Sequence, residues 1–263
     1  MRQSLKFLAM GLLFPATLIL VQPVALADIQ MTFNSAPQGY YDGVGVSPYA
    51  FTIDGNSPVY LVCDDYATEI GGGETWYANQ YGLGDVVANG PQKFTVGATT
   101  DTDQLDYTAA GLAAEDILYY NQFGGWSQFD FAMASWAIWN IFDPGAINTL
   151  SSSSIGGTCL YGSELEDNDQ ACASDAESSY LSQAALAPYV NLVIYTPCAA
   201  NGDESFCTDP ASPSGKGVAQ EFLGISRYNP PIVTPEGSSL ATLGFDLFAV
   251  FAGVFLLRKR ILT

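Results

Sequence analysis

The sequence predicts an α+β domain, a β-sandwich or barrel with a helical insert, and three observations support this fold class. Short runs of alternating apolar and polar residues, bounded by Gly, Pro, Asn and Asp, fill residues 28–81. Between residues 103 and 142, apolar residues recur every three or four positions, which is a helical spacing. Runs of β type return after residue 188. The order strands, helices, strands is typical of an α+β fold.

Four strands are expected before the helices, each a short run of β-branched, aromatic and other apolar residues ended by a turn signal. They cover residues 28–34, 49–53, 58–66 and 74–81. The Gly- and Pro-rich run 37–48 is expected to be a loop. Asp54-Gly55-Asn56 is the predicted turn of a hairpin whose second strand carries Cys63.

The first two predicted helices follow one another directly. Apolar residues from Leu105 to Tyr120 lie on one face of an amphipathic helix, which the next glycines end. Ser127 is the predicted N-cap of the second helix, residues 128–142, and Pro144 stops it because proline lacks the amide hydrogen that would continue the helix.

The third predicted helix opens with a capping box, Ser174 with Glu177 three residues later, and ends at Pro188. Two strands are expected after it, at 189–196 and 218–225.

The helix 128–142, QFDFAMASWAIWNIF, is apolar nearly all round, and such a helix is normally buried. Trp136 and Trp139 are therefore expected in the core. Cys63 is expected as a buried thiol on a core strand, because free cysteine is among the most buried residue types.

Both ends of the chain carry export signals. Residues 1–27 have a positive start, an apolar run and the cleavage site Ala25-Leu26-Ala27, which predicts a signal peptide. Residues 28–227 form the predicted ectodomain and 228–234 a linker. The tail 235–263 has a twenty-residue span, 238–257, long enough to cross a bilayer, followed by basic residues.

The exported part is strongly acidic. Between positions 28 and 234, 25 acidic residues stand against Lys93, Lys216 and Arg227, a net charge of −22. Such a surface argues against nucleic acid or anionic lipid as partner. The chain has no histidine, which excludes Ser–His and Cys–His nucleophiles and His-ligated zinc, and no cofactor is expected.

The five cysteines of an exported chain are expected in an oxidising compartment. Cys159 and Cys172 bracket one polar loop, and Cys198 and Cys207 bracket another, so two local disulfides are predicted. Cys63 is left over.

The tail carries Pro235, Glu236 and Gly237, then Ser-Ser-Leu-Ala, an apolar span and a basic end, Arg258, Lys259 and Arg260. This series resembles the PEP-CTERM sorting signal, except for Gly237 in place of the usual second proline and Asp246 within the span. The resemblance implies export from a Gram-negative bacterium, a transient inner-membrane anchor and recognition by an exosortase. The mature protein would then reach the cell surface or the extracellular matrix of a biofilm.

The sequence LVCDDY, followed about seventy residues later by ASWAIWNIFD, resembles bacterial thioester domains across residues 58–142. In that family a cysteine is joined to the glutamine of a Q-x-A-I-W helix, and Cys63 matches the cysteine. Ser135 stands at the glutamine position, and a hydroxyl offers no carbonyl to acylate. The resemblance thus implies a degenerate thioester site, Cys63 with Ser135.

Other acidic groups invite further hypotheses. Asp101, Asp103 and Asp106 suggest calcium or the start of a helix, and the latter is favoured because Leu105 occupies a ligand position. Asp64 and Asp65 are interpreted as scaffold. A solvated acidic patch is expected at Glu164, Glu166, Asp167 and Asp169.

The sequence as a whole predicts an exported surface or matrix protein with a structural or adhesive role and no catalysis. Matrix polysaccharide or other surface proteins are the expected partners, besides the exosortase and export machinery. The alternatives are a covalent thioester adhesin using Cys63, a carboxylate-dependent glycoside hydrolase, and a calcium-assisted glycan-binding module.

Overall fold

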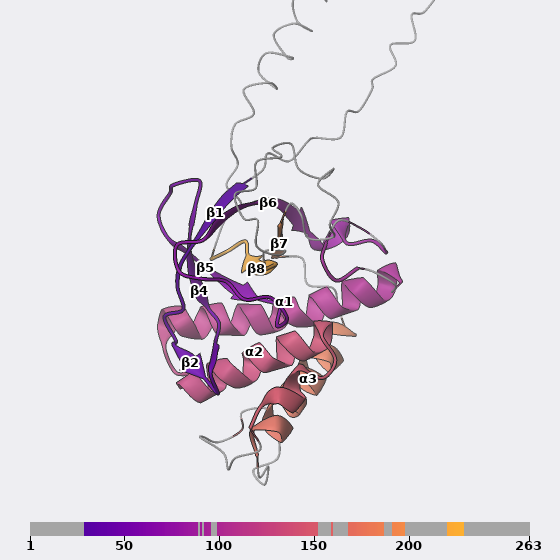
Figure 1. Ribbon diagram of the computed structural model, residues 1–263. Coiled ribbons are helices and arrows are strands. Elements are labelled where there is room, and N and C mark those ends of the chain that lie inside the picture. The colour runs from indigo at the N-terminus through magenta and orange to yellow at the C-terminus, as the bar shows by residue number, and fades with distance from the viewer. Residues whose placement is uncertain are drawn as a thin grey trace, which may run out of the picture.

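The computed structural model describes residues 29–88, 90, 92–95, 99–151, 159, 168–186, 191–197 and 220–228. Within these residues six strands form a closed antiparallel barrel, and three helices lie together on one side of it (Figure 1). The α+β class with a helical insert is confirmed. Of the two arrangements that the sequence left open, the structure has the barrel.

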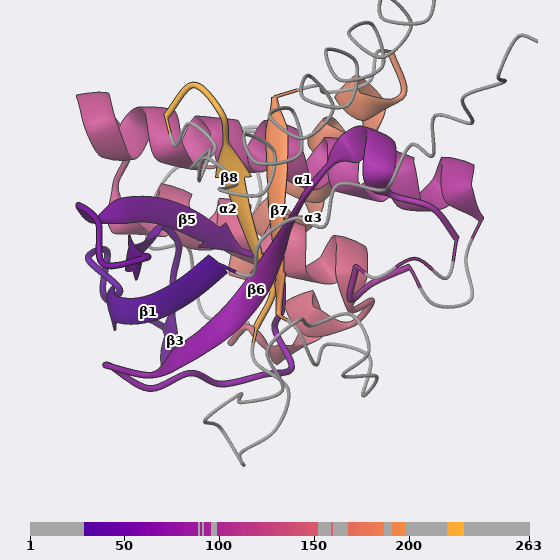
Figure 2. The same cartoon turned by 90° about the horizontal axis from the view of Figure 1, so that it is seen from above.

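The barrel order is β1-β4-β5-β8-β7-β6, and β6 pairs with β1 to close it. The strands are β1 (Ile29–Ser35), β4 (Tyr49–Ile53), β5 (Val59–Cys63), β6 (Thr75–Gly82), β7 (Leu192–Pro197) and β8 (Phe222–Ile225). β6, β7 and β8 run side by side in Figure 2. The last two strands therefore complete a barrel that the first strands begin.

The helical insert enters between β6 and β7. It consists of α1 (Thr100–Phe123), α2 (Gln128–Phe142) and α3 (Asp169–Ala184), with short 3-10 turns at Leu83–Asp85 and Ala146–Thr149. α1 contacts both β5 and β8, and α2 and α3 pack against α1 and against each other. α1, with a smaller contribution from α2, thus covers the barrel wall that contains β5, and α3 packs on these two helices.

Strand β5 lies between two apolar cores. Leu61 and Cys63 face the barrel interior, whereas Val62 faces the helices, as the alternation of a strand requires. The barrel interior is aromatic, with the rings of Phe51 and Phe222 4.6 Å apart in an edge-to-face contact. On the helix side the largest buried side chains belong to α2, as its sequence predicted.

The bounds of α2 agree with the prediction. The Ser127 hydroxyl accepts a hydrogen bond from Asp130 N, and the Asp130 carboxylate accepts one from Ser127 N at 2.7 Å. This capping box fixes the start of the helix. Trp136 and Trp139 are each 1% exposed, which confirms their place in the core.

Two local predictions are wrong. α3 starts at Asp169, because the Asn168 side chain caps it by accepting from Ala171 N at 2.9 Å; Ser174 lies inside the helix. Within the expected loop 37–48, the strands β2 (Tyr40–Tyr41) and β3 (Val44–Gly45) form a small hairpin.

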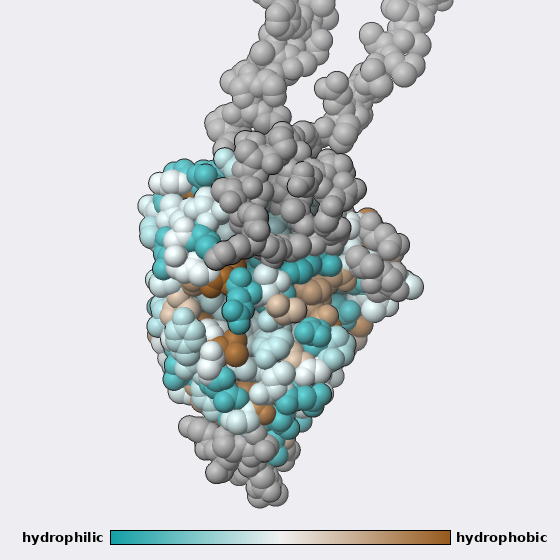
Figure 3. All heavy atoms as spheres, in the orientation of Figure 1, coloured by the Kyte–Doolittle hydropathy of each residue, from teal (hydrophilic) through white to brown (hydrophobic). Residues whose placement is uncertain are grey.

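Among the described residues, no helix combines the length and apolar content that a bilayer crossing requires. The predicted signal peptide, residues 229–234 of the linker and the sorting tail lie outside the described ranges. On the face seen in Figure 3, the described residues are largely hydrophilic or neutral, with hydrophobic ones in small groups near the middle.

Candidate functional site

The positions of the predicted degenerate thioester, Cys63 and Ser135, are linked through Ser47. The backbone N–H of Cys63 donates to Ser47 Oγ at 3.2 Å, and the backbone N–H of Ser47 donates to Ser135 Oγ at 3.1 Å. The Ser135 hydroxyl in turn donates to the carbonyl of Phe131 at 2.8 Å. All three serine and cysteine side chains are fully buried. The structure thus brings the end of β5 and the middle of α2 together by hydrogen bonds.

The Cys63 thiol is held in place and kept neutral. Its Sγ–H donates to the Asp65 carbonyl at 3.2 Å, and Trp139 Nε1 donates to the Cys63 carbonyl at 3.0 Å. Burial raises the pKa of the thiol well above its usual value, and the negative charge of Asp65 raises it further. Because the thiolate is the nucleophile, a thiol with this pKa is a weak one at neutral pH.

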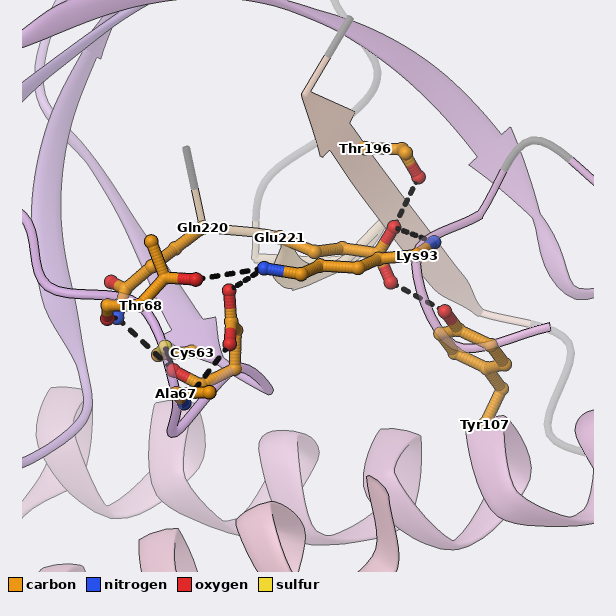
Figure 4. A network of polar contacts seen from close by, with 9 residues as sticks. Cys63, Ala67, Thr68, Lys93, Tyr107, Thr196, Gln220 and Glu221 are labelled. Carbon is orange, nitrogen blue, oxygen red and sulfur yellow. Dashed lines mark hydrogen bonds and ion pairs between the residues drawn. The ribbon is translucent and has the colours of Figure 1, made fainter. Parts of the chain in front are cut away.

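Beyond Cys63 the chain enters a buried cluster of acidic groups (Figure 4). Glu221, just before β8, is fully buried and accepts hydrogen bonds from Tyr107 Oη, from Thr196 Oγ1 and, at 3.0 Å, from Lys93 N. Burial raises the pKa of Glu221, while these donors oppose the shift by favouring the ionised form.

Asp64 is the second carboxyl of this cluster and is also fully buried. Burial raises its pKa well above the usual range, and the charges of Glu221 and Asp65 add to the shift. Among the described residues, no group donates a hydrogen bond of normal geometry to either oxygen of the Asp64 carboxyl. The Asp64 side chain lies next to Glu221. Since Glu221 accepts the better-placed donors, we assign the proton of this pair to Asp64.

Asp65 has a cation as its partner. It forms an ion pair with the Lys93 ammonium, and its Oδ1 accepts from Ala67 N at 3.1 Å. Lys93 Nζ also donates to Thr68 Oγ1 at 2.9 Å, and Gln220 Nε2 donates to the Asp65 carbonyl at 3.0 Å. Segments that are far apart in sequence therefore meet at the end of β5.

A cavity of about 500 Å³ opens beside this cluster. Aromatic side chains form much of its lining, and acidic, hydroxyl and amide groups supply the polar part. The aromatic residues are Phe33, Tyr40, Tyr49, Tyr66 and Trp139, and the polar ones are Asp65, Thr68, Glu69 and Gln220. Tyr40, on the β2–β3 hairpin, also lines the cavity and is 73% exposed. Cys63 does not line the cavity, although its partners Asp65 and Trp139 do.

The other predicted acidic features have ordinary roles where they are described. Asp101 and Asp103 lie in the first turn of α1, which Thr99 caps, so the helix-start interpretation holds. Asp169 opens α3, accepts from Tyr41 Oη at 2.7 Å and is only 2% exposed, so the prediction of a solvated patch is wrong at this residue. Glu164, Glu166 and Asp167 lie outside the described residues. In the described part of the chain, no group of His, Cys, Asp and Glu is arranged to hold a metal ion.

A disulfide joins Cys159 to Cys172, with Cα atoms 5.5 Å apart, and Cys63 is a free, buried thiol. The pairing of Cys198 with Cys207 stays a prediction, because both fall outside the described residues. The same holds for the sorting motif, whose residues are Pro235, Glu236, Gly237, Arg258, Lys259 and Arg260.

Sequence reasoning missed most of the polar network of the site, including Ser47, Lys93, Tyr107 and Glu221. Ser47 and Lys93 lie in segments without periodicity, so no pattern marked them. One signal did exist for Lys93, because it is one of only three basic residues between positions 28 and 234. A lone cation among so many acids is a candidate for a specific ion pair.

Neither a protein-family model nor a curated relative matches the chain. Among solved structures, the chain is similar to the N-terminal domain of the Streptococcus pyogenes pilus tip adhesin Cpa, at 14% identity. That match has a TM-score of 0.39 and covers 74% of this chain and 92% of the other. It is also similar to the N-terminal thioester domain of a surface protein from Clostridium perfringens, at 12% identity and a TM-score of 0.35, covering 74% and 97%. At these TM-scores neither likeness carries an argument about this chain.

Proposed function

We propose that the chain is an exported surface or matrix protein that adheres through non-covalent binding in the cavity beside β5, without catalysis. The observation that carries the proposal is the hydrogen-bonded bridge from Cys63 through Ser47 to Ser135. The Ser135 side chain has no carbonyl carbon that a thiolate could attack. Its hydroxyl already donates to the Phe131 carbonyl and accepts from the Ser47 backbone N–H. The bridge links the two positions that the cross-link of a thioester domain would join.

The cavity supports a ligand of glycan type. Its flat aromatic side chains offer apolar surface to a sugar ring, and its carboxylate, amide and hydroxyl groups offer hydrogen bonds to sugar hydroxyls. The acidic charge of the exported part disfavours anionic polymers. A neutral or amino-bearing matrix polysaccharide therefore fits best.

The delivery route completes the proposal. The signal peptide, the tail at Pro235 to Arg260 and an exosortase would bring the ectodomain from the inner membrane of a Gram-negative bacterium to its surface or matrix. This part rests on the sequence alone.

The chemical test is carried out on protein recovered from outside the producing cell. We expect a mass without the loss of one ammonia, no change on treatment with methylamine, and one alkylated thiol, Cys63, after denaturation without reductant. A mass lower by one ammonia that methylamine restores with its own addition would instead establish the covalent thioester adhesin.

The binding test uses the same protein on neutral, amino-bearing and anionic polysaccharides. Tyr40→Ala removes an exposed aromatic residue of the cavity and should weaken binding at least several-fold. Phe123→Ala is the matched control, because Phe123 is also exposed, at 63%, and lies at the end of α1 outside the cavity lining. Equal loss in both variants, or hydrolysis of the polysaccharide, would refute the proposed role.

A further inference from the structure

Lys93 is the only lysine among the described residues, and it is inserted into the acidic cluster at the end of β5. Its side chain is 15% exposed and that of Asp65 1% exposed. Two charges buried to this extent lose much of their favourable hydration free energy. The Coulomb attraction between them compensates for only part of that loss. Replacing the two charges by one neutral bond would relieve that cost.

The geometry points to an amide bond between Lys93 Nζ and the side-chain carboxyl carbon of Asp65 in the mature protein. Such a cross-link would be formed by the folded chain itself. It does not depend on the proposed ligand-binding role, and no residue of the Cys63–Ser135 bridge takes part in it.

Both reacting groups are fixed from two sides. The Lys93 backbone N–H is bound to Glu221 at 3.0 Å, and its Nζ is bound to Thr68 Oγ1 at 2.9 Å and paired with Asp65 Oδ2 (Figure 4). Asp65 is held through its backbone, because its main-chain carbonyl accepts a hydrogen bond from Gln220 Nε2 at 3.0 Å. Holding reactants in this way replaces a bimolecular encounter by an intramolecular one, which supplies much of the rate of such reactions.

The neighbours of Asp65 provide the rest of the chemistry. Oδ1 accepts the Ala67 backbone N–H at 3.1 Å, so negative charge that develops on this oxygen during attack has a donor in place. Asp64, the residue before Asp65, is fully buried, and its pKa is affected by the charges of both Asp65 and Lys93.

The atoms balance without any further reactant. One ammonium proton first passes to Oδ2 of Asp65, its partner in the ion pair. The Nζ lone pair that this frees forms the bond to Cγ of Asp65, and the bond from Cγ to Oδ2 breaks. Of the three ammonium hydrogens, one stays on the amide nitrogen and two leave with Oδ2 as water. Asp65 and Thr68 line the cavity, so the water has a route out.

The test is the intact mass of the unaltered full-length or naturally processed protein, followed by digestion with chymotrypsin. We expect a mass lower by one water than the oxidised sequence. Cleavage after Leu61, Tyr66, Leu83 and Phe94 should release the peptides 62–66 and 84–94 as one linked species. The link should survive methylamine and reductant, and trypsin should fail to cut after Lys93.

Lys93→Arg serves as the control, since it keeps the positive charge but should give the full sequence mass and two separate peptides. The inference fails if the unaltered protein has the full mass, or if it loses water without a linked peptide, because a cyclic imide of an aspartate would do the latter. Since the decisive measurement is on the unaltered protein, a variant that fails to fold leaves the result intact.

Discussion

Ser47 and Ser135 meet inside the protein: the backbone N–H of Ser47 donates to the side-chain oxygen of Ser135 at 3.1 Å. Ser47 lies in the segment before β4, and Ser135 lies in the middle of α2. The hydroxyl of Ser47 then accepts from Cys63 N on β5. Three segments of the chain are thus tied together by two short side chains, in a place from which water is excluded.

Replacing Ser135 by Ala removes the acceptor of the Ser47 N–H and leaves that buried donor unpaired. An unpaired buried donor costs about 1–3 kcal/mol, so we expect the free energy of unfolding in urea to fall by about that amount. Ser174→Ala is the control, because Ser174 is exposed within α3, and a change below about 0.5 kcal/mol is expected there. Equal effects in the two variants would mean that the bridge contributes nothing.

Asp64 makes stability depend on pH. Its folded pKa is raised above the ordinary value of 3.8, so the folded protein holds a proton that the unfolded chain releases, and stability falls as pH rises above about 4. Asp64→Asn cannot titrate, and it should flatten this fall and stabilise the protein at neutral pH relative to acidic pH. Urea unfolding at several pH values measures the slope. A fall in Asp64→Asn as steep as in the unaltered protein, or steeper, would contradict the assignment of the proton.

Trp139 supports the Cys63 end of β5. Its ring packs edge-to-face on Trp136, with centroids 4.8 Å apart, and its N–H satisfies the Cys63 carbonyl. Trp139→Ala should cost about 3–5 kcal/mol of stability, as truncations of large aromatic core residues do. It should also make the Cys63 thiol react faster with a native-state thiol reagent. Unchanged labelling would show that another part of the structure protects the thiol.

Gly224, on β8, is required by close packing. A Cβ there would lie 2.9 Å from Tyr195 Cε2 and 3.2 Å from Leu61 Cδ2. Gly224→Ala should therefore destabilise the protein by about 1–3 kcal/mol, the usual cost of overpacking. Gly72→Ala is the matched control, because a Cβ at Gly72 meets nothing within 4 Å. A thermal melt of the two variants compares them, and a neutral Gly224→Ala would mean that the barrel wall adjusts freely.

Local patterns predicted most of the elements. The strand 49–53 and the helix 128–142 have the observed bounds, since each has strong periodicity and clear end signals. The start of α3 was misplaced because two capping signals, at Asn168 and Ser174, compete within a few residues, and only packing selects between them. The choice between barrel and sandwich depended on the pairing of β6 with β1, which no local pattern encodes.

The site was predicted in part. Cys63 and Ser135 were found from the residues around them, and the structure links them. Glu221 and Lys93 were not found, because their roles come from the meeting of β8 and the segment before α1 at the end of β5. That meeting joins residues more than a hundred positions apart, such as Lys93 and Glu221, whose separation is 128.

β7 and β8 are the last strands in the sequence, and this limits the order in which the chain can fold. β5 and β6 each lack a partner strand on one side until the last strands of the domain have been synthesised, because β8 pairs with β5 and β7 with β6. Contacts of such long sequence separation slow folding. In the export route that we propose, the chain would therefore cross the inner membrane extended and close its barrel only when the last strand emerges.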